Sequence, residues 1–279
     1  MSNPLHDYTA GPAATFLKEN RQLEFIEGGT RLESVQEITF SHEEVRELPN
    51  GITIYEKNAS SSFLFWYKNR PNPRYGLPKY HVLKCRTMKS YGGFVAANSM
   101  PVSITLRNGT TSESLNLCKN CQSLVFKQGF FKTYLGKDKQ WHDVVLTLVE
   151  KLPPDQQVFS SDGYLSNWSQ VSEAYRQSVD WCCENPVCRV DLSDPAHRKY
   201  LHTHHLRGTK RNSRQDLEAL CLLCHAMEHP EKMGNGSGIF NVQDMVGLFR
   251  ARLDPTKVKA FEKLMASFTD RFDAGIGTD

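Results

Sequence analysis

The chain has 279 residues and a mass of 31.8 kDa, with 39% apolar and 23% charged residues and a mean hydropathy of −0.51. These values are typical of a soluble globular protein and exclude a collagen-like chain. The sequence contains no run of about 18 apolar residues, so no transmembrane helix is expected. The first twenty residues lack the basic and then apolar pattern of an export signal, so we expect a cytoplasmic protein that does not enter a membrane.

The charge is unevenly distributed, although its net value is only +3. Residues 1–56 contain four Lys or Arg and ten Asp or Glu, whereas residues 57–139 contain fourteen and two. Residues 140–279 carry a net charge of −3. A basic segment of this length favours a polyanionic partner, most often a nucleic acid. A solvated basic surface without a partner is the alternative.

The predicted elements of the first half are mainly strands. A turn at residues 49–51 precedes a first strand, and Asn108-Gly109 is a typical hairpin turn. Short apolar or alternating runs predict strands at residues 52–55, 62–67, 94–98 and 102–107. We therefore expect residues 1–140 to comprise an acidic start and a basic, mainly β domain that recognises nucleic acid.

The predicted elements of the second half are mainly helices. Apolar residues at helical spacing predict one helix at residues 140–151, which Pro153 and Pro154 end. A second helix is expected from Trp168 to Trp181, with Ser166 or Asn167 as its cap. We divide this half into a helix and linker, a compact module and a helical tail, at residues 141–170, 171–232 and 233–279. In the tail, helices are expected near residues 242–252 and 255–268.

The cysteines occur in close pairs, which suits metal ligation better than scattered core packing. A first candidate zinc site combines a histidine–cysteine pair with a cysteine pair. Its four residues are His81, Cys85, Cys118 and Cys121. Its Cys-x-x-Cys half resembles a zinc knuckle and follows a strand rather than the context of a redox motif. In the alternative, Cys85 is buried, His81 is exposed and the other two cysteines form a redox pair.

A second candidate zinc site lies near the carboxy-terminal end, with one close pair on each side of a histidine-rich strand. Its four cysteines are Cys183, Cys188, Cys221 and Cys224. Four thiolates form a closed, tetrahedral structural site, which suits a short segment with little apolar area of its own. Cys182 is left over and is expected to be a small core residue.

The segment between residues 177 and 230 resembles the HNH, or ββα-metal, nuclease family. The resemblance rests on Leu-His-Thr-His-His-Leu at residues 201–206 and Asp-Leu-Glu-Ala-Leu-Cys-Leu-Leu-Cys-His at residues 216–225. It implies an α+β fold with an HNH module in which a strand, a loop, a second strand and a helix follow one another. In this protein the module would contain zinc knuckles with four cysteine ligands, follow the β-rich zinc-containing domain and precede short helices.

The resemblance implies a role for each polar residue of the module. His204 and His225 would hold a divalent metal, and His205 would be the general base. His229 is a further candidate ligand or a phosphate contact. Asp216 occupies the position of the family's middle Asn, and whether Asn212 takes that role instead is left open. The catalytic ion is expected to be Mg²⁺ or Mn²⁺, while one or two Zn²⁺ ions would be structural.

The loop between the two strands supports a nucleic-acid substrate. It carries four basic residues, which we expect to contact phosphates: Arg207, Lys210, Arg211 and Arg214. The predicted function is that of a metal-dependent endonuclease that hydrolyses double-stranded DNA, in restriction or phage defence. The alternatives are an inactive, zinc-stabilised DNA- or RNA-binding protein and an RNA-directed nuclease.

Two further hypotheses concern assembly and control. Two cuts in a duplex require two active sites, so a homodimer formed through the closing helices is one hypothesis. The same helices are equally compatible with packing against the nuclease module. In the other hypothesis, a partner controls the activity and the acidic residues 1–56 shield the basic segment.

Overall fold

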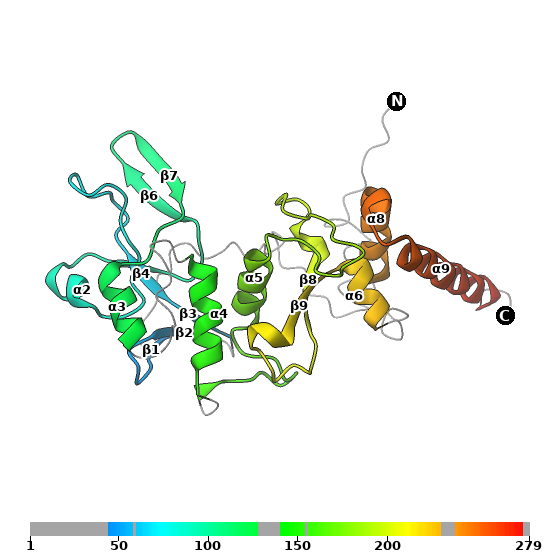
Figure 1. Ribbon diagram of the computed structural model, residues 1–279, viewed down its shortest axis with the longest axis horizontal. Coiled ribbons are helices and arrows are strands. Elements are labelled where there is room, and N and C mark those ends of the chain that lie inside the picture. The colour runs from blue at the N-terminus through cyan, green and yellow to red at the C-terminus, as the bar shows by residue number, and fades with distance from the viewer. Residues whose placement is uncertain (1–43, 58–59, 128–139, 154–155, 230–237, 276–279) are drawn as a thin grey trace, which may run out of the picture.

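The computed structural model describes residues 44–57, 60–127, 140–153, 156–229 and 238–275. The protein is α+β, with four small antiparallel sheets among these residues. Figure 1 shows an elongated arrangement in which the β-rich part lies at one end and helices α8 and α9 lie at the other. Helices α4 and α5 and a short hairpin lie between the two ends. The prediction of an α+β chain is confirmed at this level.

In the amino-terminal part, the described residues form three of the four sheets and two short helices. Strands β1, β2 and β3 form one sheet, β4 pairs with β5, and β6 pairs with β7. The elements are β1 (Val45–Glu47), β2 (Thr53–Lys57), β3 (Ser60–Phe63), β4 (Phe65–Tyr67), α2 (Arg86–Ser90), β5 (Val95–Ala97), β6 (Val102–Leu106), β7 (Gly109–Glu113) and α3 (Lys119–Lys127). The turn predicted before β2 is present, because the amide of Gly51 donates to the carbonyl of Leu48 at 2.8 Å.

The single strand predicted at residues 62–67 is two strands in different sheets. Strand β3 pairs with β2, β4 pairs with β5, and Leu64 lies between them. Phe63, Leu64 and Phe65 are all buried. A continuous apolar run of this kind indicates burial on both faces but gives no sign of where the chain changes partner. The predicted end at Tyr67 is therefore confirmed, whereas the predicted start and the continuity of the strand are wrong, because β3 begins at Ser60 and a second strand begins at Phe65.

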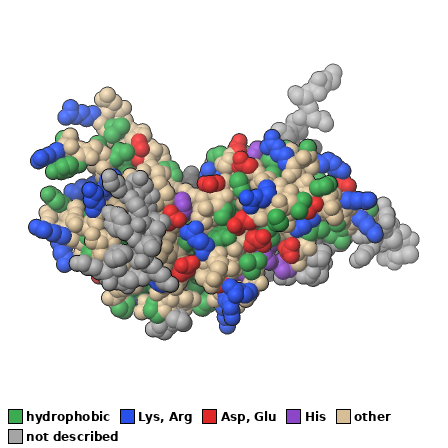
Figure 2. All heavy atoms as spheres, in the orientation of Figure 1, with side chains coloured by type: hydrophobic (Ala, Val, Ile, Leu, Met, Phe, Trp, Pro, Cys, Tyr) green, Lys and Arg blue, Asp and Glu red, His purple; other side chains and the backbone are tan. Residues whose placement is uncertain are grey.

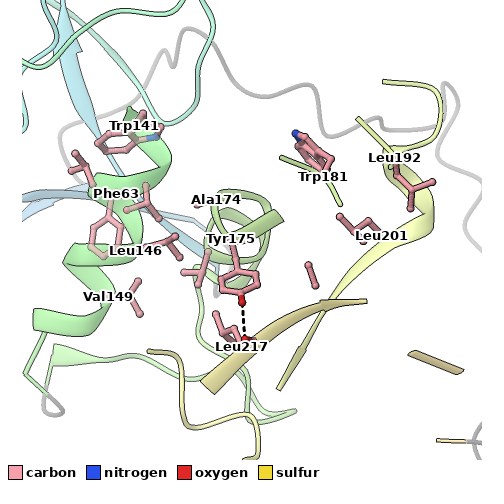
Figure 3. Packing of buried hydrophobic residues seen from close by; sticks show 14 of the residues in the cluster. Phe63, Trp141, Leu146, Val149, Ala174, Tyr175, Trp181, Leu192, Leu201 and Leu217 are labelled. Atoms are coloured by element: carbon pink, nitrogen blue, oxygen red, sulfur yellow. Dashed lines mark hydrogen bonds between the residues drawn. The ribbon is translucent and has the colours of Figure 1, made fainter. Parts of the chain in front are cut away.

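Helices α4 (Trp141–Lys151) and α5 (Trp168–Ser178) connect the β-rich part to the histidine-rich hairpin. The Trp141 ring lies 4.7 Å from that of Phe65, so α4 is anchored on the amino-terminal sheets. Figure 3 shows that the other side of α4 faces α5, whose Tyr175 reaches the hairpin at Leu217. Helix α5 ends before the predicted Trp181, because Asp180 and Trp181 both adopt positive φ angles, of 53° and 57°.

The hairpin and the helices after it form the remaining part. Strands β8 (Leu201–His205) and β9 (Leu217–Cys221) pair in antiparallel fashion, and α6 (Leu222–Glu228) follows β9 directly. Helices α8 (Gly238–Phe249) and α9 (Pro255–Gly275) both pack against α6. Short 3-10 helices lie at Arg198–Tyr200, Arg214–Asp216 and Arg250–Arg252. Within the described residues, no helix combines the length and the apolar composition that crossing a membrane requires.

The hydroxyl of Tyr175 joins α5 to the hairpin by a hydrogen bond, and removing it tests how much this contact stabilises the fold. It donates to the carbonyl of Leu217 at 2.7 Å and lies 2.9 Å from a carboxylate oxygen of Glu184. We expect Tyr175→Phe to lower the free energy of unfolding by about 1–3 kcal/mol, because buried acceptors lose their donor. Urea unfolding of the zinc-loaded protein measures this. Exposed Tyr75→Phe is the control, and equal effects of the two substitutions would contradict the prediction.

Candidate active site and metal centres

The four cysteines of the carboxy-terminal candidate site converge at the corner between β9 and α6. Cys221 ends β9, Cys224 lies in the first turn of α6, and the other two, Cys183 and Cys188, precede β8. All four are buried and their sulfur atoms lie within 4.8 Å of one another. The Sγ atoms of Cys188 and Cys221 are 3.7 Å apart. Sulfurs bound tetrahedrally to zinc lie about 3.8 Å apart, so this cluster can hold a zinc ion.

The protonation of this cluster also favours a cation. Hydrogen bonding to Cys183 and the neighbouring thiols lowers the pKa of Cys188. The same neighbours, together with burial, raise the pKa of Cys221. These opposite shifts reflect the repulsion among neighbouring buried thiolates, which a bound cation would relieve. Metal binding would release the remaining protons, so zinc affinity should fall as the pH falls.

The amino-terminal candidate site is also assembled. His81, Cys85, Cys118 and Cys121 are buried, and their ligand atoms lie within 4.8 Å of one another. The Nδ1 atom of His81 lies 3.2 Å from the Sγ of Cys85 and 3.7 Å from that of Cys121. Hydrogen bonds from Cys121 and His81 lower the pKa of Cys118. The burial of His81 contradicts the alternative in which it is exposed, and the donor set can hold a zinc ion.

A third cluster consists of imidazoles alone. His204 of β8 and His225 and His229 at the end of α6 bring one ring nitrogen each within 4.8 Å of the others. The His204 ring lies 5.2 Å from each of the other two rings. His202 is next to this cluster, since its Nδ1 is 3.4 Å from that of His225. The three imidazoles are half-buried, and their arrangement can hold a divalent metal on one face of β8.

His205 follows His204 directly and points toward α5 instead. Its ring stacks on that of Trp168 at 4.3 Å, with an angle of 29° between the planes. Neighbouring residues of a strand face opposite sides, which explains why His204 contacts α6 and His205 contacts α5. Thr203, which shares the His205 side, confirms this orientation, because its hydroxyl donates to the carbonyl of Ser172 in α5 at 3.0 Å.

Asn212, not Asp216, contacts His205. Its Oδ1 atom is 3.0 Å from the Nε2 of His205, and its Nδ2 atom donates to the carbonyl of Thr209 at 3.2 Å. The second bond fixes the orientation of the amide, so the oxygen faces the ring. An amide oxygen only accepts hydrogen bonds. Nε2 of His205 therefore carries the proton, and Nδ1 is the nitrogen left to accept another.

Asp216 lies at the base of the same loop and holds it together. Its carboxylate pairs with Arg207 at 2.5 Å and accepts a hydrogen bond from the Ser213 hydroxyl. The Ser213 hydroxyl and the Arg207 guanidinium lower the pKa of Asp216. Arg214 likewise pairs within the protein, with Asp143 of α4 at 3.2 Å. Lys210 and Arg211 are exposed and form no ion pair among the described residues.

Residues from both faces of β8 line the same cleft, which has a volume of about 680 Å³. His204, His225 and His229 line it together with His205, although His204 and His205 point to different helices. The other residues that line it include Tyr164, Trp168 and Arg176. No local motif indicated these three, because they come from α5 and the turn before it. The Cys pairs and the His-His dipeptide, by contrast, were recognisable from their spacing.

Comparison with known proteins gives one informative similarity. The chain is 24% identical over 200 residues to the "Zorya protein ZorE" of Escherichia coli, and the match covers 65% of this chain. The chain spans about half of that relative's length, since the match covers 52% of it. The sequence matches no protein-family model. No solved structure matches it either.

The two cysteine-containing clusters predict the zinc content of the protein. Elemental analysis of the full chain should give two tightly held zinc ions. Cys224→Ser and Cys118→Ser should each lose one of them, because each removes a ligand from a different cluster. Cys182→Ser is the control and should retain both, since Cys182 belongs to neither cluster. One zinc in the wild-type protein, or a loss on replacing Cys182, would be inconsistent with two independent sites.

Proposed function

We propose that the protein is a metal-dependent, HNH-type endonuclease that hydrolyses DNA phosphodiester bonds. The observation that carries the proposal is one cleft in which three convergent imidazoles lie beside a fourth, separately oriented imidazole. His204, His225 and His229 form the convergent group, and His205 is the separate ring. The ββα order of β8, β9 and α6 agrees with the order of elements that the sequence resemblance implies.

The convergent imidazoles suit a divalent cation of borderline character, and Mn²⁺ or Mg²⁺ is the working ion that we propose. When bound, such a cation would polarise the phosphoryl oxygen and stabilise the charge on the leaving alkoxide. The carboxy-terminal thiolate cluster would hold a structural zinc ion instead, since it offers no open position to substrate. The two kinds of site thus differ in ligand chemistry and in access to the cleft.

His205 accounts for the proton transfer. Asn212 holds the Nε2–H of the ring, which leaves Nδ1 to take a proton from the attacking water. The water oxygen forms a bond to phosphorus while the bond between phosphorus and the departing sugar oxygen breaks. Stacking on Trp168 fixes the plane of the His205 ring, so the base needs no reorientation during the reaction.

The loop before β9 supplies positive charge next to the cleft. Because Arg207 and Arg214 pair with acidic residues of the protein, we assign the phosphate contacts mainly to Lys210 and Arg211. Each contact would release counterions from DNA and make binding dependent on salt. Arg176 lines the cleft and is held in place, because its Nη1 atom donates to the carbonyl of Leu201 at 2.8 Å.

Defence against phage is the biological role that we propose. The similarity to the Zorya protein ZorE supports it, over the 200 residues that the two sequences share. The resemblance of the carboxy-terminal module to HNH nucleases agrees with this role. DNA cleavage is the step that this chain would contribute.

The proposal is tested by nicking of supercoiled plasmid in the presence of Mn²⁺ or Mg²⁺. We expect the wild-type protein to nick DNA and His205→Ala to be about 10²–10⁴-fold slower, because the substitution removes the general base. The His142→Ala variant is the matched control, since His142 lies on α4 and does not line the cleft. Zinc content and thermal unfolding should be unchanged in both variants.

The same assay separates the alternatives. A wild-type protein that binds DNA without nicking it under any metal condition would favour a zinc-stabilised binding protein over an enzyme. Cleavage of labelled RNA in preference to duplex DNA would favour an RNA-directed nuclease. Either result would reject the proposed reaction.

Asn212 is a positioning residue, because it acts through His205. Asn212→Ala should slow nicking about 10–100-fold, since the His205 ring loses the acceptor that fixes its tautomer. Asn212→Asp keeps an acceptor at the same place and should shift the acidic limb of the pH–rate profile upward. An adjacent carboxylate favours the charged imidazole, so a higher pH is needed to leave Nδ1 unprotonated. Unchanged pH profiles in both variants would rule out this role.

A further inference from the structure

The amino-terminal zinc candidate fixes the geometry of the surface around it. Cys85 is the residue from which α2 begins, and Cys118 immediately precedes α3. His81 forms a two-way backbone bridge with Trp66 of β4, at 2.8 Å in each direction. One ion bound by these residues would therefore hold two helices and a strand in a fixed relation. That relation determines where the side chains of α2 and of the loop after β4 lie.

The surface around this site is basic and has few acidic partners. Figure 2 shows Lys and Arg side chains gathered at the end of the molecule formed by α2, β4–β5 and the β6–β7 hairpin. We define the basic face by five exposed cations that form no ion pair among the described residues: Arg70, Arg74, Arg86, Lys89 and Arg107. On such a face the cations repel one another unless an anion is bound.

Several contacts show that the elements of the basic face adjoin one another. The carbonyl of Asn69 accepts a hydrogen bond from the amide of Thr105 at 2.7 Å, which places the loop after β4 against β6. The Lys68 ammonium lies over the rings of Tyr91 and Phe94, at 5.8 and 5.2 Å. Lys68 thus links β4 to the segment after α2. The cations on these elements belong to one continuous surface.

Two tyrosines project from the basic face. Tyr75 is 73% exposed and Tyr91 is 62% exposed, whereas Phe65 and Tyr80 of the same region are fully buried. Tyr75 sits on a rigid turn, because Asn72 and Gly76 exchange two backbone hydrogen bonds of 2.9 Å. An exposed aromatic side chain on a rigid support is suited to contact with a base or a sugar.

We propose that the basic face is a second DNA-binding surface, which holds the phosphate backbone of the duplex outside the cleft. This proposal rests on the proposed function for the choice of DNA as the polyanion. Cations spread over three elements suit the extended and regular charge of a duplex. Tyr75 and Tyr91 would add contacts that do not depend on salt. The amino-terminal metal site would then support DNA binding by fixing the basic face, and the cleft would carry out DNA cleavage.

The test uses the full-length, zinc-loaded protein with His205→Ala, so that DNA is bound but not cut. Affinity for a short duplex is measured across a salt series for the parent and for R74Q/R86Q/R107Q. We expect at least about tenfold weaker binding, and a salt slope reduced by about 0.9 for each cation that contacts a phosphate. The matched control is R46Q/R250Q/K257Q, which removes three cations that pair with Glu56, Glu262 and Glu228.

The aromatic contribution is tested in the same background. Y75A/Y91A should weaken binding at least about fivefold and leave the salt slope unchanged, because contacts of an uncharged side chain release no counterions. A measurement on the parent protein avoids any effect of substitution on folding. Duplex DNA should protect Lys89 from acetylation, whereas it should protect exposed Lys84, which already pairs with Glu47, to a smaller extent.

The outcomes distinguish this proposal from the proposed function. Unchanged affinity and slope in R74Q/R86Q/R107Q would overturn the second surface, even if the wild-type protein nicks plasmid. Weaker binding of RNA with unchanged binding of duplex DNA would overturn it as well. A protein that never nicks DNA but needs these cations to bind it would support the second surface and reject the nuclease.

Discussion

The convergence of the two cysteine pairs is the constraint on which the carboxy-terminal module depends. Helix α6 has only seven residues and begins directly at the end of β9, so its own hydrogen bonds hold it weakly. An ion held by Cys183, Cys188, Cys221 and Cys224 would attach this corner to the segment before β8. Since α6 carries His225 and His229, the same attachment sets their distance from His204. Zinc binding at the cluster would therefore contribute directly to the stability of the imidazole site.

Adjacent histidines of strand β8 face two different helices. His204 faces α6 and joins the convergent imidazoles, while His205 faces α5, where Trp168 supports its ring. Asn212, from the loop between the strands, completes the surroundings of His205. Because successive residues alternate in direction, two adjacent histidines can serve two different roles on one short strand. The cleft at the end of β8 brings the two roles together.

The sequence was informative wherever chemistry depends on local spacing. The cysteine pairs, the His-His dipeptide and the hairpin turn at Asn108-Gly109 each lie within a few residues, so their geometry follows from the backbone period. Contacts over long separations were not predictable in this way. Asp216 matched the expected spacing, yet Asn212 reaches His205, because the path of the loop decides which polar side chain arrives there. Trp168 comes from a helix more than thirty residues earlier in the chain, and no pattern in the sequence relates it to β8.

The contact of the His205 ring with α5 has a consequence for how the proposed activity would be lost. Helix α5 is joined to α4 and thereby to the amino-terminal sheets, whereas the convergent imidazoles depend on α6. A displacement of α5 would remove the support that Trp168 gives the His205 ring, whereas the three convergent imidazoles come from β8 and the end of α6. The molecule could then be fully metallated and yet inert. Under the proposed mechanism, ion occupancy and catalytic competence would be separable, because the general base depends on a helix that supplies none of the three convergent imidazoles.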